Sequence, residues 1–177
     1  MKKIITLLIM ITVLTAGCSD TGVNEQNQDN TQQEDTQINS NAIIAPDFEL
    51  ESIDGTTIKL SNLKDKNVII NFWATWCGFC VTEMPDLQRL QDIYKDKDLL
   101  ILTVNVGETK EQVQKFMEDN NLELAVVLDK DMEVSNMYGV RSFPTTIAVN
   151  KKGEAVRGYV GMLTYEQMEQ LYDYFQE

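Results

Sequence analysis

The sequence predicts an α/β domain in which helices flank a central mixed sheet, with a small β-hairpin added at its N-terminal side. Two nearly continuous apolar runs of strand length, residues 67–74 and 99–106, are typical of central strands buried on both faces. Segments with helical spacing of apolar residues alternate with these runs, and two further strands precede the last helix. At 177 residues, the chain has room for one ordinary domain with a single core.

The folded part begins with the hairpin. Two short strands, residues 48–50 and 57–60, flank a turn at Asp54-Gly55, a dipeptide that favours hairpin turns. The first central strand is followed by a helix that we expect at residues 79–96. Four apolar side chains fall on one face of this helix, namely Met84, Leu87, Leu90 and Tyr94.

The middle of the domain continues the alternation of strands and helices. After the second central strand, Thr109 is a suitable N-cap for a helix at residues 110–120. A third strand is expected at 124–128 and a short helix near 132–138.

Two antiparallel strands and a helix complete the domain. Residues 145–150 and 155–160 pair across a turn at residues 151–153. Thr164 then caps a final helix that is expected to run to the C-terminus.

The first 17 residues have the pattern of an export signal. Lys2 and Lys3 supply the positive start, and the apolar run 4–14 is too short to span a bilayer, which takes roughly 20 apolar residues. Small residues then precede Cys18, which resembles the bacterial lipoprotein signal, although Thr15 stands where that signal usually has leucine. We therefore expect cleavage before Cys18 and its acylation, for example with palmitate. An ordinary signal peptide with a chance cysteine and an uncleaved anchor are the alternatives.

Residues 18–45 read as a lipidated cysteine followed by a flexible tether. The stretch is rich in Asn and Gln, with five acidic residues, no basic residue and almost no large apolar side chain, so we expect it to be disordered. A tether of about 27 residues has an end-to-end distance of roughly 25 to 30 Å. It would link the domain at residues 46–177 to the membrane.

Charge and composition argue against several classes of partner. Without residues 1–17 the chain keeps 13 basic against 28 acidic residues, a net charge of −15, which disfavours nucleic acid and direct docking on anionic lipid. The membrane link is then covalent or through a protein. Histidine is absent, which removes histidine-based general bases, metal sites and haem ligands, so we expect neither metal nor cofactor.

Cys77 and Cys80 are the cysteines that remain once Cys18 is lipidated. A disulfide across so small a loop would stabilise the fold very little, so a reactive pair is the better explanation. Cys77 lies where a strand meets a helix, and the helix N-terminus favours its thiolate. Cys80, one turn further on, can attack a mixed disulfide at Cys77. We therefore predict that Cys77 is the nucleophile and Cys80 the resolving thiol. A zinc half-site, the common alternative, lacks a second CxxC and a histidine here.

The run from Asn71 to Cys80, NFWATWCGFC, resembles the active-site strand and helix start of thioredoxins. Three features resemble the TlpA/ResA-like branch more closely: Asn71 where cytoplasmic thioredoxins have a buried aspartate, Glu83-Met84-Pro85, and the leader at residues 45–50. The resemblance covers about residues 45–177. It implies a thioredoxin-like fold and disulfide exchange outside the cytoplasmic membrane. Phe79 stands where proline is commonest, which leaves the reduction potential open.

The resemblance also implies a substrate surface. Pro144 corresponds to the cis-proline of the fold, packed beside the cysteines, and the backbone of the preceding Phe143 would hydrogen-bond an extended substrate. An ordinary turn before a strand is the alternative. Trp73 and Trp76 are expected to pack, and Trp76, beside Cys77, also to form part of the substrate surface.

Glu83 lies one turn beyond Cys80 and is the nearest ionisable candidate, since Asn71 cannot carry a proton. We hypothesise that it tunes the thiol pKa values and shuttles a proton to Cys80. The alternative is a solvated glutamate on the helix surface.

Together these features predict a monomeric, lipid-anchored thiol-disulfide oxidoreductase on the extracytoplasmic face of the bacterial cytoplasmic membrane. The resemblance implies a reductant of exported proteins, supplied with electrons by a membrane thiol-transfer protein. Apocytochromes c and methionine sulfoxide reductases are candidate substrates. A disulfide-forming oxidant of the same fold and a surface binding lipoprotein with an incidental disulfide remain alternatives. A peroxiredoxin is disfavoured because Ala74 occupies the position of its threonine.

Overall fold

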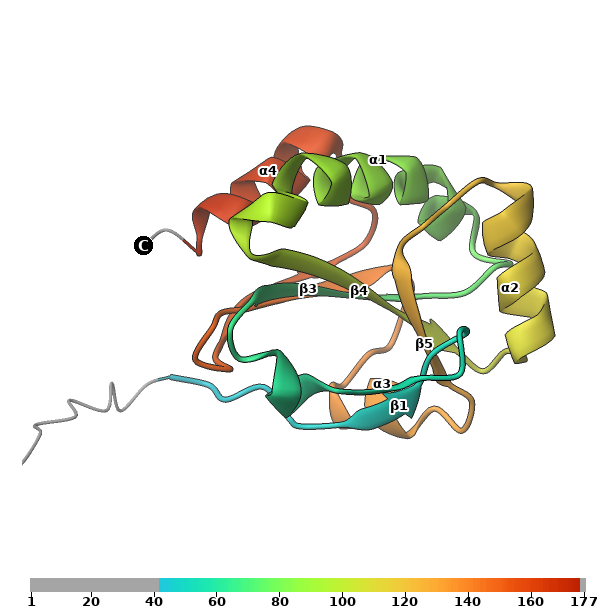
Figure 1. The fold of residues 1–177 in the computed structure, drawn as a ribbon, viewed down its shortest axis with the longest axis horizontal. Helices are drawn as coiled ribbons and strands as arrows, with labels where there is room; N and C mark the ends of the chain where they lie inside the picture. Colours follow the sequence, from blue (N-terminus) through green and yellow to red (C-terminus); the bar gives the residue numbers. More distant parts are fainter. Residues whose placement is uncertain (1–41, 176–177) are drawn as a thin grey trace, which may run out of the picture. The chain divides into compact units, whose positions relative to one another are not determined.

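A five-stranded mixed sheet forms the centre of the computed structural model, which describes residues 42–175 (Figure 1). The strand order is β5-β4-β3-β6-β7. Strand β3 pairs in parallel with β4 and β4 with β5, whereas β6 runs antiparallel to both β3 and β7. The strands have these bounds: β3 Asn67–Trp73, β4 Leu99–Val106, β5 Ala125–Asp129, β6 Thr145–Val149 and β7 Ala155–Val160. The mixed sheet predicted from the sequence is confirmed.

Helices lie on both faces of this sheet. Figure 1 shows α1 and α4 on one face, and α3 together with the N-terminal hairpin on the other. The helices have these bounds: α1 Gly78–Tyr94, α2 Lys110–Asp119, α3 Glu133–Met137 and α4 Tyr165–Asp173. Two short 3-10 helices, Leu60–Leu63 and Lys95–Lys97, were not expected, and the second explains why α1 ends earlier than predicted. The final helix ends at Asp173 and does not continue to the C-terminus.

The predicted hairpin is present and packs through aromatic side chains. Strands β1 (Glu49–Glu51) and β2 (Thr57–Lys59) are antiparallel. Phe48, directly before β1, makes an edge contact with Tyr138, their ring centroids 6.0 Å apart. The Tyr138 hydroxyl donates a hydrogen bond of 2.6 Å to the carbonyl of Pro46. The N-terminal extension is therefore fixed to the domain by both apolar and polar contacts.

Strand β3 supplies both halves of the core, because all of its residues are buried. Ile69 and Trp73 belong to the cluster formed with α1, α2 and α4. Ile70 and Phe72 belong to the cluster on the hairpin side. This alternation follows from strand geometry, in which successive side chains point to opposite faces. It places Asn71, between Ile69 and Trp73, on the face that α1 covers.

The two predicted threonine caps are confirmed. The hydroxyls of Thr109 and Thr164 accept hydrogen bonds from the backbone N–H of Gln112 and Gln167 respectively. Each glutamine side chain in turn accepts from the backbone of its threonine, which completes a capping box.

The export signal at residues 1–17, Cys18 and the tether as far as residue 41 lie outside the described residues. Within residues 42–175, no helix is long and apolar enough to cross a membrane.

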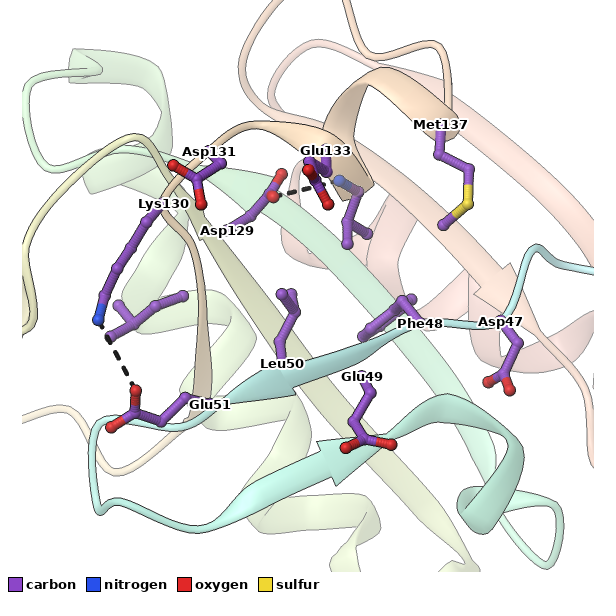
Figure 2. Close-up of a pocket in the computed structure, with 12 residues that line it drawn as sticks. Asp47, Phe48, Glu49, Leu50, Glu51, Asp129, Lys130, Asp131, Glu133 and Met137 are labelled. Carbon is purple, nitrogen blue, oxygen red and sulfur yellow. Dashed lines mark hydrogen bonds and ion pairs between the residues drawn. The ribbon is translucent and has the colours of Figure 1, made fainter.

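A pocket of about 380 Å³ lies between β1 and α3 (Figure 2). Six of its twelve lining residues are acidic, and one of these, Glu51, forms an ion pair of 3.7 Å with Lys130. Asp129 uses both carboxylate oxygens to accept the backbone N–H groups of Val134 and Ser135 at the start of α3. The lining contains neither Cys77 nor Cys80, and in the described part of the chain no group of side chains is placed to hold a metal ion.

Candidate active site

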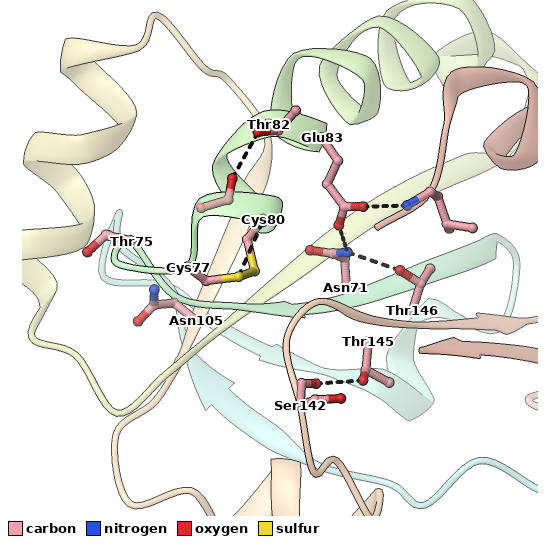
Figure 3. Close-up of a disulfide and its surroundings, with 12 residues drawn as sticks. Asn71, Thr75, Cys77, Cys80, Thr82, Glu83, Asn105, Ser142, Thr145 and Thr146 are labelled. Carbon is pink, nitrogen blue, oxygen red and sulfur yellow. Dashed lines mark hydrogen bonds between the residues drawn. A yellow bond between two sulfur atoms is a disulfide. The ribbon is translucent and has the colours of Figure 1, made fainter. Parts of the chain in front are cut away.

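Cys77 and Cys80 form a disulfide where β3 leads into α1 (Figure 3). Cys77 is the N-cap of α1 and Cys80 lies in its first turn, with their Cα atoms 5.3 Å apart. The backbone N–H of Cys80 donates a hydrogen bond of 3.2 Å to the Cys77 sulfur. The side chain of Cys77 retains 7% exposure, whereas Cys80 is completely buried. A partner molecule can therefore reach Cys77 first.

Glu83 is buried beneath α1, with only 1% of its surface exposed. Its Oε1 accepts a hydrogen bond of 2.8 Å from Asn71 Nδ2, and its Oε2 accepts one of 2.9 Å from the backbone N–H of Leu163. Burial raises the pKa of Glu83 from 4.5 to about 7, although the hydrogen bonds from Leu163 and Asn71 act in the opposite direction. The alternative of a solvated helix glutamate is therefore wrong.

Asn71 links this carboxyl group to the sheet. Its Nδ2 also donates a hydrogen bond of 3.0 Å to the hydroxyl of Thr146 on β6, the residue paired with it across the strands. Figure 3 shows the Asn71 side chain between Glu83 and Thr146. Its Oδ1 is buried and has no hydrogen-bond partner among the described residues. Asn71 thus acts as a donor to the carboxyl group and carries no charge of its own.

The structure places two of the predicted substrate-surface residues, Trp76 and Phe143, in one groove with Cys77. The Phe143–Pro144 bond is cis, as expected. The rings of Trp76 and Phe143 meet edge to face, with centroids 5.8 Å apart. Both line a groove of about 500 Å³ that also contains Cys77 and Phe79.

Trp73 and Trp76, which were both expected to pack, differ greatly in exposure. Trp73 is completely buried, as a packing residue should be. Trp76 is 70% exposed, so its expected packing is limited to the edge contact with Phe143. The difference arises because Trp73 ends β3 inside the core, whereas Trp76 lies in the loop that follows the strand.

A second buried carboxylate, Glu108, lies next to the loop that carries Cys77 and was not predicted from the sequence. Its Oε2 accepts hydrogen bonds of 2.7 Å from the backbone N–H of Thr75 and from Asn105 Nδ2, and its Oε1 accepts the Thr75 hydroxyl at 2.5 Å. Thr75 lies two residues before Cys77, whose own N–H donates to the carbonyl of Ala74 at 3.1 Å. Glu108 therefore holds the loop that leads into Cys77.

The position of Glu108 could have been recognised from the strand order. It follows the carboxyl end of β4, which is parallel to β3 and adjacent to it, so both strands end at the same edge of the sheet. Gly107, with φ of +76°, makes the turn between the end of β4 and Glu108, a conformation that suits glycine.

Comparisons with known proteins agree with this geometry. The model of the AhpC/TSA family matches residues 43–157. The thiol-disulfide oxidoreductase ResA of Geobacillus thermodenitrificans is 40% identical over 126 residues, which cover 71% of this chain and 72% of the relative.

Two solved structures share the fold at lower identity. StoA from Bacillus subtilis is 29% identical with a TM-score of 0.64, over 73% of this chain and 98% of that one. The exposed lipoprotein thioredoxin Etrx1 from Streptococcus pneumoniae is 31% identical with a TM-score of 0.61, over 72% and 99%. The Cys77–Cys80 disulfide at a helix N-terminus is the kind of cysteine pair that thiol-disulfide exchange uses. The chain therefore belongs to the AhpC/TSA family of thioredoxin-like proteins and is a thiol-disulfide oxidoreductase related to ResA.

Proposed function

We propose that this oxidoreductase reduces disulfides of exported proteins at the extracytoplasmic face of the cytoplasmic membrane. The observation that carries the proposal is the asymmetry of the pair: Cys77, at a helix N-terminus, retains 7% exposure, whereas Cys80 is fully buried. The backbone N–H of Cys80 already points at the Cys77 sulfur, where it would stabilise a thiolate. Cys77 is therefore the nucleophile in this proposal.

In one cycle the two thiols of Cys77 and Cys80 become a disulfide, and one substrate disulfide becomes two substrate thiols. The Cys77 thiolate attacks a substrate sulfur, forming a mixed disulfide and releasing the first substrate thiolate. Cys80 then loses its proton and attacks the Cys77 sulfur, which releases the second substrate thiolate and leaves Cys77 and Cys80 oxidised. The substrate gains two electrons and the enzyme loses two, so a membrane thiol-transfer protein is needed to restore the dithiol.

Glu83 is the proposed proton acceptor for Cys80. The two residues lie one turn apart on α1, and the buried thiol has to lose its proton before it attacks. With a pKa of about 7, the carboxyl group of Glu83 is divided between its two protonation states near neutral pH. It can therefore both accept a proton from Cys80 and return it when the dithiol is restored.

Trp76, Phe143 and Pro144 form the proposed substrate surface beside Cys77. Trp76 and Phe143 share the groove with the sulfur, and Trp76 offers a large exposed ring. An extended substrate segment would pair with the backbone at Phe143 while its cysteine faces Cys77. The proposed substrates are exported proteins with accessible disulfides, such as apocytochromes c or methionine sulfoxide reductases.

Acylation of Cys18 is the proposed membrane link, with residues 18–45 as tether and a monomeric domain at its end. The exposed lipoprotein Etrx1 has the same fold at 31% identity, which supports an anchored mode of action. A Cys18→Ala variant should leave the membrane fraction while keeping its disulfide exchange activity. Retention of this variant in the membrane would contradict the anchor.

The reduction potential of the Cys77–Cys80 pair tests the direction of electron flow. A value near that of thioredoxin, about −270 mV, agrees with a reductant, whereas one near −120 mV would reverse the assignment. A Cys80→Ala variant should accumulate mixed disulfides with its exported substrates, and the Cys77→Ala variant should trap none. Failure of the wild-type protein to reduce insulin with dithiothreitol as electron donor would refute the enzymatic role.

A further inference from the structure

We infer that the groove beside Cys77 selects substrate segments that carry a carboxylate near the reacting cysteine, through an ion pair with Arg141. The inference rests on the proposed reduction of protein disulfides and specifies which polypeptides react fastest. It requires three features of the groove: an apolar wall for the substrate backbone and side chains, a cation at its rim, and the absence of acidic groups from its lining.

The apolar wall is exposed in the described structure. Trp76, Phe79 and Met132 are 70%, 67% and 51% exposed, and all three line the groove with Cys77. Exposed apolar side chains gathered at one place mark a binding surface, since isolated ones are normal but clusters are not. Phe79, between the two cysteines, adds an aromatic ring to this wall.

The charges of the groove differ from those of the whole chain. The chain carries a formal charge of −13, yet Arg141 is the one charged residue that lines the groove. None of the ion pairs formed among residues 42–175 involves Arg141. Asp131 and Glu133 line the acidic pocket shown in Figure 2 and are absent from the groove lining. The guanidinium group is thus free to pair with an incoming carboxylate, which it can bind through two parallel hydrogen bonds.

Arg141 is placed to meet a substrate residue close to the cysteine. It lies two residues before Phe143, whose backbone pairs with the substrate in the proposed complex. An extended chain advances about 3.3 to 3.6 Å per residue, so a substrate side chain about two residues from the reacting cysteine lies opposite Arg141. Aspartate or glutamate at that place gains an ion pair, and lysine meets a like charge.

The test uses symmetrical disulfides of short capped peptides that differ at one position. The variable residue is Asp, Asn or Lys, placed two residues before the cysteine in one series and two residues after it in another. The second-order rate constant for oxidation of the reduced protein is followed by tryptophan fluorescence. At low ionic strength we expect Asp to react roughly three- to tenfold faster than Lys in one of the series, the size expected for an exposed ion pair and its reversal. Salt at about 0.5 M should reduce this preference.

Three matched variants and a neutral substrate separate the possible outcomes. Arg141→Gln should abolish the preference and Arg141→Glu should reverse it, while Arg157→Gln, which removes an equal charge from β7, should retain it. Arg157→Gln should reduce bis(2-hydroxyethyl) disulfide at the wild-type rate, and the rates of each Arg141 variant with the charged peptides are divided by its own rate with this uncharged substrate.

Equal rates for Asp and Lys in both series, or an unchanged preference in Arg141→Gln, would overturn the role of Arg141 alone. Failure of the wild-type protein to react with any of these disulfides would instead overturn the proposed reductase function.

Discussion

Replacing Glu83 with glutamine should remove a large pH dependence from the stability of the oxidised protein. Burial raises the pKa of Glu83 from 4.5 to about 7, so the folded state holds this proton over a pH range in which the unfolded chain has lost it. The stabilisation linked to the proton is fully present below about pH 4.5 and is lost as the pH rises through about 7. At roughly 1.4 kcal/mol per pKa unit, the loss amounts to about 3 kcal/mol.

Glutamine keeps much of the packing at this position without an ionisable group. The Oε1 atom of the new glutamine can still accept a hydrogen bond from the Leu163 N–H. Its Nε2 can donate to Asn71 Oδ1 once the asparagine amide turns over. In the wild type this Oδ1 has no hydrogen-bond partner among the described residues. The free energy of unfolding of Glu83→Gln should therefore equal or fall below that of the wild type at pH 4.5. By pH 8 it should have gained about 3 kcal/mol relative to the wild type.

Guanidinium denaturation at intervals from pH 4.5 to pH 8, with the disulfide intact, measures this difference. Glu118→Gln, an exposed change of the same type on α2, is the control and should give a difference that hardly varies with pH. Other carboxyl groups also make the stability depend on pH, such as Asp98, whose pKa is lowered by the hydrogen bond and charge of Lys151. Their contribution is the same in the wild type and the variant, so it cancels in the difference. A difference between wild type and Glu83→Gln that stays constant over this range would refute the assignment of the raised pKa to Glu83.

Glu108→Ala should lower the free energy of unfolding by about 2 to 4 kcal/mol, because the Thr75 N–H and the Asn105 amide lose their buried acceptor. The same change should slow the reaction of Cys77 with insulin, and an unaltered rate with normal stability would exclude a positioning role for Glu108. Leu90→Ala, in the core between α1 and the sheet, should cost about 2 to 5 kcal/mol while leaving the reduction potential unchanged. A shift of the potential in Leu90→Ala would mean that core packing tunes the disulfide directly.

Local patterns in the sequence were sufficient to predict the strands and α-helices and the cysteine pair, although not the two 3-10 helices. Strand β3 is recognisable because a strand buried on both faces must be apolar along its whole length, and it is buried throughout. The contacts of Glu83 could not be predicted in the same way. Its second partner, the Leu163 N–H, is 80 residues away in the sequence. Every residue except proline has a backbone N–H, so the sequence does not show which of them will bond to Glu83. Glu108 and Thr75, 33 residues apart, meet because two parallel strands end at the same edge of the sheet.

The pairing of Asn71 with Glu83 gives a physical reason for an amide at the strand position. An aspartate there would place two carboxyl groups in one buried site, and their repulsion would raise the pKa of one of them further. The neutral amide instead donates to Glu83 and to Thr146, which offsets part of the cost of burying the carboxyl group. The second carboxylate oxygen of Glu83 accepts the N–H of Leu163, the residue directly before the N-cap of α4. The pKa of Glu83 therefore depends on β3, α1 and the start of α4 together. A change that displaces α4 should therefore alter the pH dependence of disulfide exchange even though α4 contributes no group to the chemistry.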